Sequence, residues 1–542
     1  MDIWTGPFSF IHPSTTYSDL QLDLYDPAFT FSEKLQRHTS YDSTQTLPDQ
    51  VPYVAAIHTA IYNKLWCLAI DAKTRQELSA CLNFLVTTEK VPKFVSIYFR
   101  NWHFNCPMIH RPSFDPAKAP LNLVISILFV GAMYSKEQSE RVAAKRLLDV
   151  AELVVFDSEV FSLEMEINRV LQGGVNCGFA GYDPSRPDQD WERFEELQAG
   201  FLMVIAQYWG AGQTVAKRRA MESRFGDVIK VARKFNLHRA RHQPSDRISE
   251  TAWLQKESRI RTTAMIGLID CAMRIYTNYP CRLALAELEV DLPCKEAIFA
   301  SQHPFMQDES IFAPRLTISQ AFALLFDKSS TPPLSTASSL TSTSVIDPKL
   351  SSAAPAASQT LTNLFDCDLT VFNLFILIHY LYLYIHSYIM TVSLNLPTTA
   401  LPSTTQPGRR PGHQGSGGVV GHSGSDSEAC APDSKTGPTT NTFFSSSPLR
   451  QDIQRALERW RQLWQAWCAG ASEETLRTAG MFRAGHNFWL VSQLLMTSEE
   501  AVNVITGMEI GCDDALTKLK TLLQSDTELD QNQSGSVVEH QI

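Results

Sequence analysis

The sequence lacks any pair of closely spaced cysteines. Its 542 residues include 11 cysteines, the nearest two, Cys271 and Cys281, are ten positions apart, and no Cys-x-x-Cys occurs. A structural zinc site needs two ligands within one tight turn, so that both thiolates reach the same ion. The thiol spacing therefore predicts no zinc finger, zinc ribbon or six-cysteine zinc cluster in these residues, and we assign no metal ligand.

The chain is also poor in charge and has no export signal at its start. Charged residues make up 19% of the sequence and the formal net charge is −10. This mild acidity argues against a surface coated with phosphate-binding charge, so any contact with nucleic acid would be local. The first ten residues have neither a basic region nor an apolar run, and we expect an intracellular protein without disulfides.

Motifs that carry catalysis are missing as well. The sequence contains no dinucleotide fingerprint, Walker loop, kinase motif set or His-Glu-x-x-His. His238 and His242 are four residues apart, but Arg239 stands where a zinc protease has glutamate, and arginine repels a cation. We predict no catalytic residue, no cofactor-binding residue and no cofactor.

What the sequence does contain is helical periodicity. From residue 51 to 327, apolar residues recur at spacings of three, four and seven, and alternating runs typical of strands are few. Pro120 precedes LNLVISILFVGAMY, which predicts a helix that is apolar nearly all round and lies at the centre of a core. The fold class expected is all-α.

Composition divides the rest of the chain into segments. Two stretches are too rich in Ser, Thr, Gly and Pro to pack. The first 50 residues hold seven acids and two bases between apolar residues, and this composition predicts a disordered leader able to fold onto a partner. The predicted organisation is a leader (1–50), a helical domain (51–327), a Ser/Thr/Pro-rich linker (328–360), a buried helical segment (361–396), a Gly/Ser/Pro-rich linker (397–448), C-terminal helices of the same domain (449–525) and an acidic tail (526–542).

The buried segment resembles a membrane span in its hydropathy. We nevertheless predict a soluble core helix, because a polar stripe runs down one side and no basic residue follows until Arg409. The stripe consists of Asn373, Tyr380, Tyr384, Ser387 and Thr391.

One basic concentration stands out, with ten bases and three acids in residues 217–247. On a helical wheel its apolar residues gather on one side and its cations on the other. The possible contacts for a polyanion or an acidic partner are Arg219, Lys230, Arg233 and Lys234. Lys217, Arg218 and Arg219 form a possible nuclear-import triplet. A merely solvated face is the alternative interpretation.

Four passages in sequence order resemble the fungal-specific transcription factor domain, the helical middle region of many fungal zinc-finger regulators. The first is YFRNWHFNCPMIHRPSF with the apolar helix after it. The second comprises 194–210 and 217–238 and ends in the family's Ala-Arg-x-hydrophobic-x-Leu pattern at Ala232, Arg233 and Leu237. The third is 253–294, where the pattern falls on Trp253, Glu257, Arg259, Arg261, Asp270 and Pro280. The fourth comprises FNLFILIHYLYLYIH, ALERWRQLWQAW and MFRAGHNFWLVSQLL, similar to the subgroup that usually begins with Cys2His2 fingers.

The resemblance implies a nuclear regulator of transcription, as in many regulators of secondary-metabolite gene clusters. Because the cysteine spacing excludes the family's usual DNA-binding module, we expect the chain to act through the transcription machinery or another transcription factor. DNA would be contacted indirectly or weakly, and no membrane is involved. The alternatives are a truncated finger protein, a helical interaction scaffold without DNA binding, or a helical enzyme with a pocket around His379 and His386.

Overall fold

The structure is a computed structural model of the chain. It describes residues 52–171, 187–210, 212–307, 309–327, 364–394, 447–472, 475, 479–511, 518–519 and 521–522. The predicted leader, the predicted 328–360 linker, residues 397–446 of the second linker and the acidic tail lie outside the described residues.

Helices form nearly all of the regular structure that is described. The first group is α3 (Pro52–Trp66), α4 (Ala72–Leu85), α5 (Lys90–Ile97), α6 (Leu121–Met133), α7 (Gln138–Val155), α8 (Leu163–Leu171), α9 (Pro187–Ile205), α10 (Thr214–Arg219) and α11 (Phe225–Lys234). The second group is α12 (Glu250–Thr277), α13 (Glu296–Phe299), α14 (Ile318–Leu325), α15 (Val371–Leu394), α16 (Pro448–Gly470), α18 (Gly485–Thr497) and α19 (Glu499–Thr506). Pairing of extended backbone within the described ranges amounts to one isolated bridge between Asp291 and Thr317. The predicted all-α class is confirmed.

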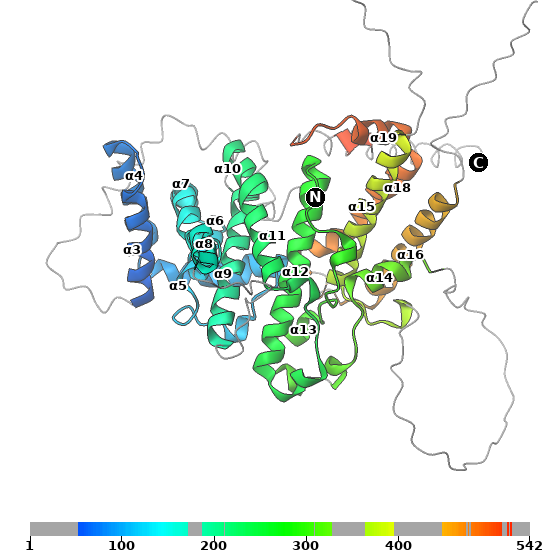
Figure 1. Cartoon of the computed structure of the whole chain (residues 1–542), viewed down its shortest axis with the longest axis horizontal. Coiled ribbons are helices and arrows are strands. Elements are labelled where there is room, and N and C mark those ends of the chain that lie inside the picture. The colour runs from blue at the N-terminus through cyan, green and yellow to red at the C-terminus, as the bar shows by residue number, and fades with distance from the viewer. Residues whose placement is uncertain are drawn as a thin grey trace, which may run out of the picture.

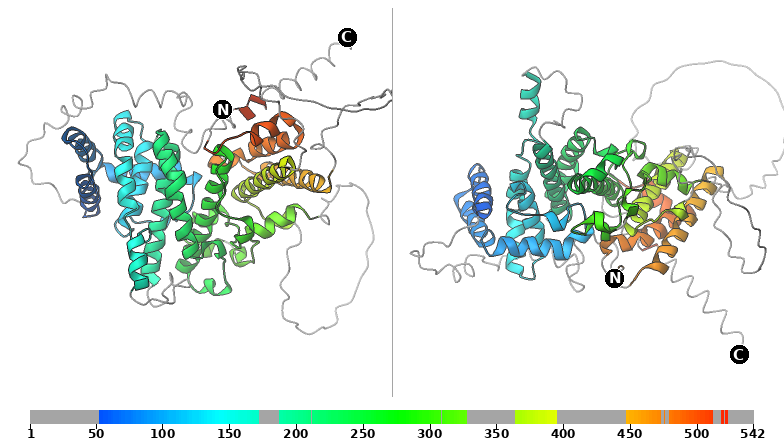
Figure 2. Two further views of the ribbon diagram at one scale, coloured as in Figure 1. Left: turned by 45° about the horizontal axis from the view of Figure 1, so that its top comes forward. Right: turned by 90° about the horizontal axis from the view of Figure 1, so that it is seen from below.

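The helices stand side by side in a series that broadly follows the chain (Figure 1). α3 and α4 lie at one end, α12 crosses the middle, and α15, α16 and α18 lie at the other end, a succession that is also visible from the two sides in Figure 2. Side chains from α3 through α19 contribute to one continuous hydrophobic core. A smaller cluster surrounds Trp253 at the start of α12 and includes Phe299 of α13.

The helix after Pro120 occupies the centre of its neighbours, as the apolar pattern predicts. Every residue of α6 from Leu123 to Met133 is buried, and the helix contacts α5, α7 and α9. Its one hydroxyl is satisfied inside the core, because Ser126 Oγ donates to the carbonyl of Ala199 at 2.9 Å.

The apolar segment with the membrane-like hydropathy is a helix of the core. Val371–Val392 is the one described helix long and apolar enough to cross a membrane, and 61% of its most apolar window is buried inside the protein. α15 contacts α12, α14, α16 and α18. Of the predicted polar stripe, Asn373 and Tyr380 are buried, whereas Tyr384, Ser387 and Thr391 are exposed. The stripe therefore marks the solvent side only toward the end of the helix.

Close packing of α5 against α6 depends on a glycine, and this gives a testable prediction. A Cβ atom added at Gly131 would overlap the backbone of Phe94, including its carbonyl oxygen. Because backbone atoms cannot move aside as a flexible side chain does, we expect Gly131→Ala to lower the free energy of unfolding by about 3 kcal/mol. Urea unfolding followed by circular dichroism measures this loss.

The matched control is Gly226→Ala in α11. A Cβ atom there meets nothing within 4 Å, so the substitution should leave stability unchanged or raise it by about 0.5–1 kcal/mol. Equal urea midpoints for the two variants would show that α5 and α6 are not packed as described.

Candidate functional site

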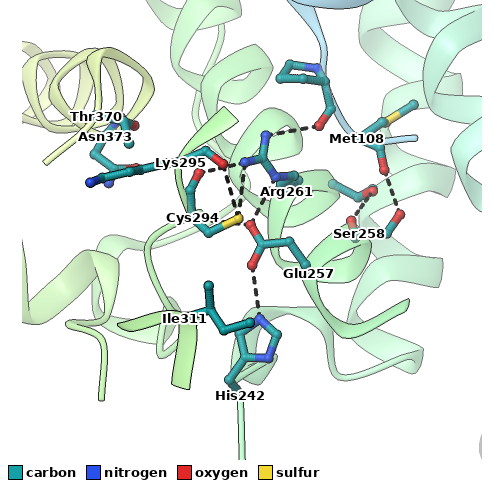
Figure 3. Close-up of polar contacts among 12 residues, drawn as sticks. Met108, His242, Glu257, Ser258, Arg261, Cys294, Lys295, Ile311, Thr370 and Asn373 are labelled. Atoms are coloured by element: carbon teal, nitrogen blue, oxygen red, sulfur yellow. Dashed lines mark hydrogen bonds and ion pairs between the residues drawn. The ribbon is translucent and has the colours of Figure 1, made fainter. Parts of the chain in front are cut away.

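A buried carboxylate on α12 organises the polar centre of the molecule (Figure 3). The Glu257 side chain is fully buried, and its Oε1 accepts from Arg261 Nε at 2.9 Å and from the backbone N–H of Cys294 at 2.8 Å. Its Oε2 lies 2.8 Å from Arg315 Nη1 and 3.0 Å from His242 Nε2. Burial alone would raise the pKa of Glu257, but Arg315, the hydrogen bond to His242 and Arg261 outweigh it, and the pKa lies well below its ordinary value.

The same network ties α12 to segments that are distant in sequence. Arg261 Nη2 donates to the carbonyl of Cys294 at 2.6 Å, and its guanidinium lies 4.4 Å from the centre of the Phe299 ring. Ser258 Oγ donates to the carbonyl of Met108 at 2.6 Å (Figure 3). One side of α12 is therefore fixed to the residues before α6 and to the chain around α13.

A second buried carboxylate holds the loop between α11 and α12. Asp291 accepts from the backbone N–H of His242 at 2.9 Å and from Arg241 Nε at 2.8 Å, and its own N–H donates to the carbonyl of Ala240. Thr263 Oγ1 donates to the carbonyl of Leu237 at 3.0 Å. Hydrogen bonds to Thr263 of α12 and to Asp291 thus hold residues 237–242 on their inner side. The outer side of this loop therefore has a fixed conformation.

That outer surface forms one wall of a groove with a volume of about 560 Å³. Residues 234–243 face the start of α12 and Asp190 of α9 across it. Five basic residues line the groove, namely Lys234, Arg239, Arg241, Lys256 and Arg259, against two acidic residues, Asp190 and Asp246. The lining therefore carries a net charge of 5 − 2 = +3. This basic groove is the candidate functional site.

A neighbouring cavity of about 330 Å³ shares Gln255 with the basic groove. It is lined by polar groups that include His110, Asp115, Glu195 and Gln198. Burial raises the pKa of Glu195 to about 7. The lining of this cavity carries no basic cluster, because Lys118 is its one Lys or Arg.

Comparison with known proteins identifies the part of the chain that forms this site. Residues 95–310 match the family model of the fungal specific transcription factor domain. Over 225 residues it is 26% identical to Transcription factor verF of Penicillium polonicum, an alignment that covers 41% of this chain and 29% of that protein. The matched region thus spans less than a third of that relative, and no solved structure matches the chain.

The structure places the predicted polyanion contacts against different neighbours. On the apolar side of the helical wheel, Phe235 is half-buried, and the residues that are buried are Met221, Phe225, Val228, Ile229 and Ala232. Arg219 forms ion pairs with Asp149 and with the buried Glu152 of α7, the latter at 2.7 Å. Arg233 is bound to Glu287 at 2.8 Å. Lys230 is exposed, and Lys234 lines the basic groove.

The predicted import triplet lies at the end of α10. Arg218 is the most exposed of the three, with 69% of its side chain accessible, whereas Lys217 lies 5.0 Å from the centre of the Tyr208 ring. Both roles, polyanion contact and nuclear import, stay predictions for these residues.

Sequence reasoning missed the partners that build the basic groove. It assigned no role to Lys256 or Arg241, and it considered His242 only as a zinc ligand, whereas the structure places His242 on Glu257. His238 and His242 point to different surroundings, and the described residues contain no cluster of three or more His, Cys, Asp or Glu side chains able to hold a metal ion. The net charge of residues 217–247 was the one signal that led toward this region.

The two histidines of the enzyme alternative are core residues of α15. His379 lies between Phe375 and Phe488, with 4.2 Å between ring centres on each side, and its Nδ1 is 2.8 Å from the carbonyl of Phe375. His386 Nδ1 accepts from Arg274 at 3.4 Å. Burial lowers the pKa of each imidazole to about 4. The two cavities described above are lined by other residues.

Proposed function

We propose that the protein regulates transcription in the fungal nucleus, acting through the surface of its helical domain rather than as an enzyme. The observation that carries the proposal is the fungal specific transcription factor domain at residues 95–310. A relative named as a transcription factor, aligned over 225 residues, supports it.

In this proposal the described helices supply a rigid surface for proteins of the transcription machinery or for another transcription factor. The arginines of the basic region are largely engaged in ion pairs, so DNA is contacted indirectly or weakly. The acidic and apolar residues of the first 50 positions suit the docking of an activation segment on coactivators.

A tethering assay tests the regulatory role. The full chain is fused to a bacterial DNA-binding domain whose operator lies upstream of a reporter gene in a fungal host. We expect reporter expression to change by about tenfold or more relative to the DNA-binding domain alone, because recruitment bypasses the need for DNA readout by the chain itself. An unchanged reporter, with the fusion present at equal amounts, would contradict the proposal.

Nuclear import is tested with the first two residues of the basic triplet. We expect Lys217→Gln with Arg218→Gln to shift a fluorescent fusion of the full chain from nucleus to cytoplasm, while Arg219 stays paired with Glu152. Lys73→Gln with Lys136→Gln, two exposed lysines elsewhere, is the matched control. Retention of the Lys217→Gln, Arg218→Gln variant in the nucleus would contradict a role of the triplet in nuclear import.

The finer assignment is control of a biosynthetic gene cluster, which the family resemblance suggests. Transcript profiling of a deletion strain should then show coordinated change in a contiguous set of biosynthetic genes, restored by the full chain. Scattered changes without such a set would contradict this assignment. Sequence-selective binding of labelled promoter fragments by the purified chain alone would overturn the indirect mode of action.

A further inference from the structure

The basic groove combines an excess of positive charge with apolar walls. Its net charge of +3 is concentrated in the loop 239–241 and on the exposed side of α12. The apolar residues of the lining are Phe235, Leu237, Ala240 and Ala252. Leu237 and Ala240 are buried, so Phe235 and Ala252 supply most of the accessible apolar surface. A ligand that fits this surface carries several negative charges separated by apolar groups.

The pairing of the arginines argues against a compact phosphate as the ligand. Arg241 is engaged with Asp291 at 2.8 Å and Arg259 with Asp190 at 2.6 Å. Phosphate sites use arginine forks whose donors face the ligand, and here one donor of each of these two arginines already serves a carboxylate. Lys256 has no hydrogen bond or ion pair with another described residue. Arg239 Nε lies 3.4 Å from Glu289, but 64% of the Arg239 side chain stays exposed. Single, spaced carboxylates suit these two cations better than a phosphodiester does.

We propose that the basic groove binds the acidic segment 17–31 of this same chain. The segment reads YSDLQLDLYDPAFTF, in which Asp19, Asp23 and Asp26 alternate with leucines and aromatic residues. Its carboxylates complement Lys256 and Arg239, and its leucines and aromatic rings complement the apolar walls. The proposal does not rest on the proposed function, because it concerns a contact within the chain.

The connection to α3 is long enough for this contact. Residues 32–51 separate the segment from Pro52, the first residue of α3. Twenty residues span up to roughly 70 Å when extended. The longest helix among the described residues, α12, has 28 residues, which corresponds to about 42 Å. The effective concentration of a tethered segment is high, so even a modest affinity would keep the basic groove occupied.

Binding of a labelled peptide to full-length proteins tests the proposal. The probe is a fluorescent synthetic peptide with the sequence of residues 17–31, and fluorescence anisotropy reports its binding. The full chain with Asp19→Asn, Asp23→Asn and Asp26→Asn is expected to bind the probe about tenfold more tightly than the wild type, because its own segment no longer competes. Equal affinities would overturn the proposal.

The cations of the groove are then reversed in the background of the neutralised segment. Adding Arg239→Glu and Lys256→Glu should weaken probe binding by about tenfold or more, whereas adding Lys73→Glu and Lys136→Glu, with the same change in net charge, should leave it unchanged. Binding should also weaken as salt rises from about 0.1 M to 1 M, where the Debye length falls from about 10 Å to 3 Å. Unchanged binding by the groove variant would overturn the assignment.

A folding control, a milder variant and a competitor complete the test. Circular dichroism checks that each variant keeps its helix content, and Arg239→Gln with Lys256→Gln provides a milder pair that should still weaken binding. A short DNA duplex of mixed sequence is added as competitor. Displacement of the probe by an equal concentration of duplex would assign the basic groove to a phosphodiester backbone and overturn the proposal.

Discussion

Replacing Glu257 by glutamine is expected to lower the free energy of unfolding by about 3–5 kcal/mol, the cost of breaking a buried ion pair by removing one partner. Arg261 is fully buried, and 15% of the Arg315 side chain is exposed. Both guanidiniums would keep their charge after the substitution, because arginine is not deprotonated in proteins. The new amide group would also face donors on every side.

Urea unfolding measures the loss, and an exposed ion pair supplies the control. Glu77 binds Arg146 at 3.0 Å, with more than a third of each side chain accessible. Glu77→Gln should therefore cost no more than about 1 kcal/mol. Similar midpoints for Glu257→Gln and Glu77→Gln would show that the network around Glu257 contributes little to stability.

The stability difference between wild type and Glu257→Gln should depend on pH in a known direction. The pKa of Glu257 is lower in the folded protein than its ordinary value of 4.5. Its stabilising contribution is therefore present above pH 4.5 and is lost as the pH falls through the folded-state pKa. The difference in the free energy of unfolding between wild type and Glu257→Gln should be constant near neutral pH and should decrease as the pH falls. A gap that stayed constant into strong acid would mean that Glu257 is not ionised in the native state.

The fold could be predicted from the sequence wherever burial follows a helical period. The run after Pro120 and the segment around His379 both form helices where the pattern places them. Ser447, a residue type that favours helix N-caps, caps α16, because its side chain accepts from the N–H of Arg450. In these elements each residue's environment depends mainly on its own position in the helix.

The site was less predictable because its contacts join distant parts of the chain. Ser258 bonds to Met108, 150 positions away, and Glu257 bonds to Arg315, 58 positions away. Charged residues are rarely fully buried unless they are paired, and a periodic pattern does not contain the partner. For the same reason the helical wheel placed Arg219 on the solvent side, whereas in the structure Arg219 forms an ion pair with Glu152 of α7.

Truncating Trp460 to alanine is expected to lower the free energy of unfolding by about 3–5 kcal/mol, through the cavity that it leaves. Trp460 of α16 is fully buried, and its Nε1 donates to the carbonyl of Leu374 in α15 at 2.8 Å. Its ring stacks on Trp464 with 5.3 Å between centres. The substitution therefore removes both packing and a buried hydrogen bond between α15 and α16. In the sequence, α15 ends at Leu394 and α16 begins at Pro448.

Trp66→Ala is the matched control, because this ring at the end of α3 is 54% exposed. It should lower the free energy of unfolding by less than about 1 kcal/mol.

The number of transitions in the urea unfolding curve carries further information. If α15 and α16 unfold together with the helices around α12, as expected from their shared core, Trp460→Ala shifts one cooperative transition to lower urea. A second transition that kept the wild-type midpoint would instead mean that the C-terminal helices unfold as a unit of their own.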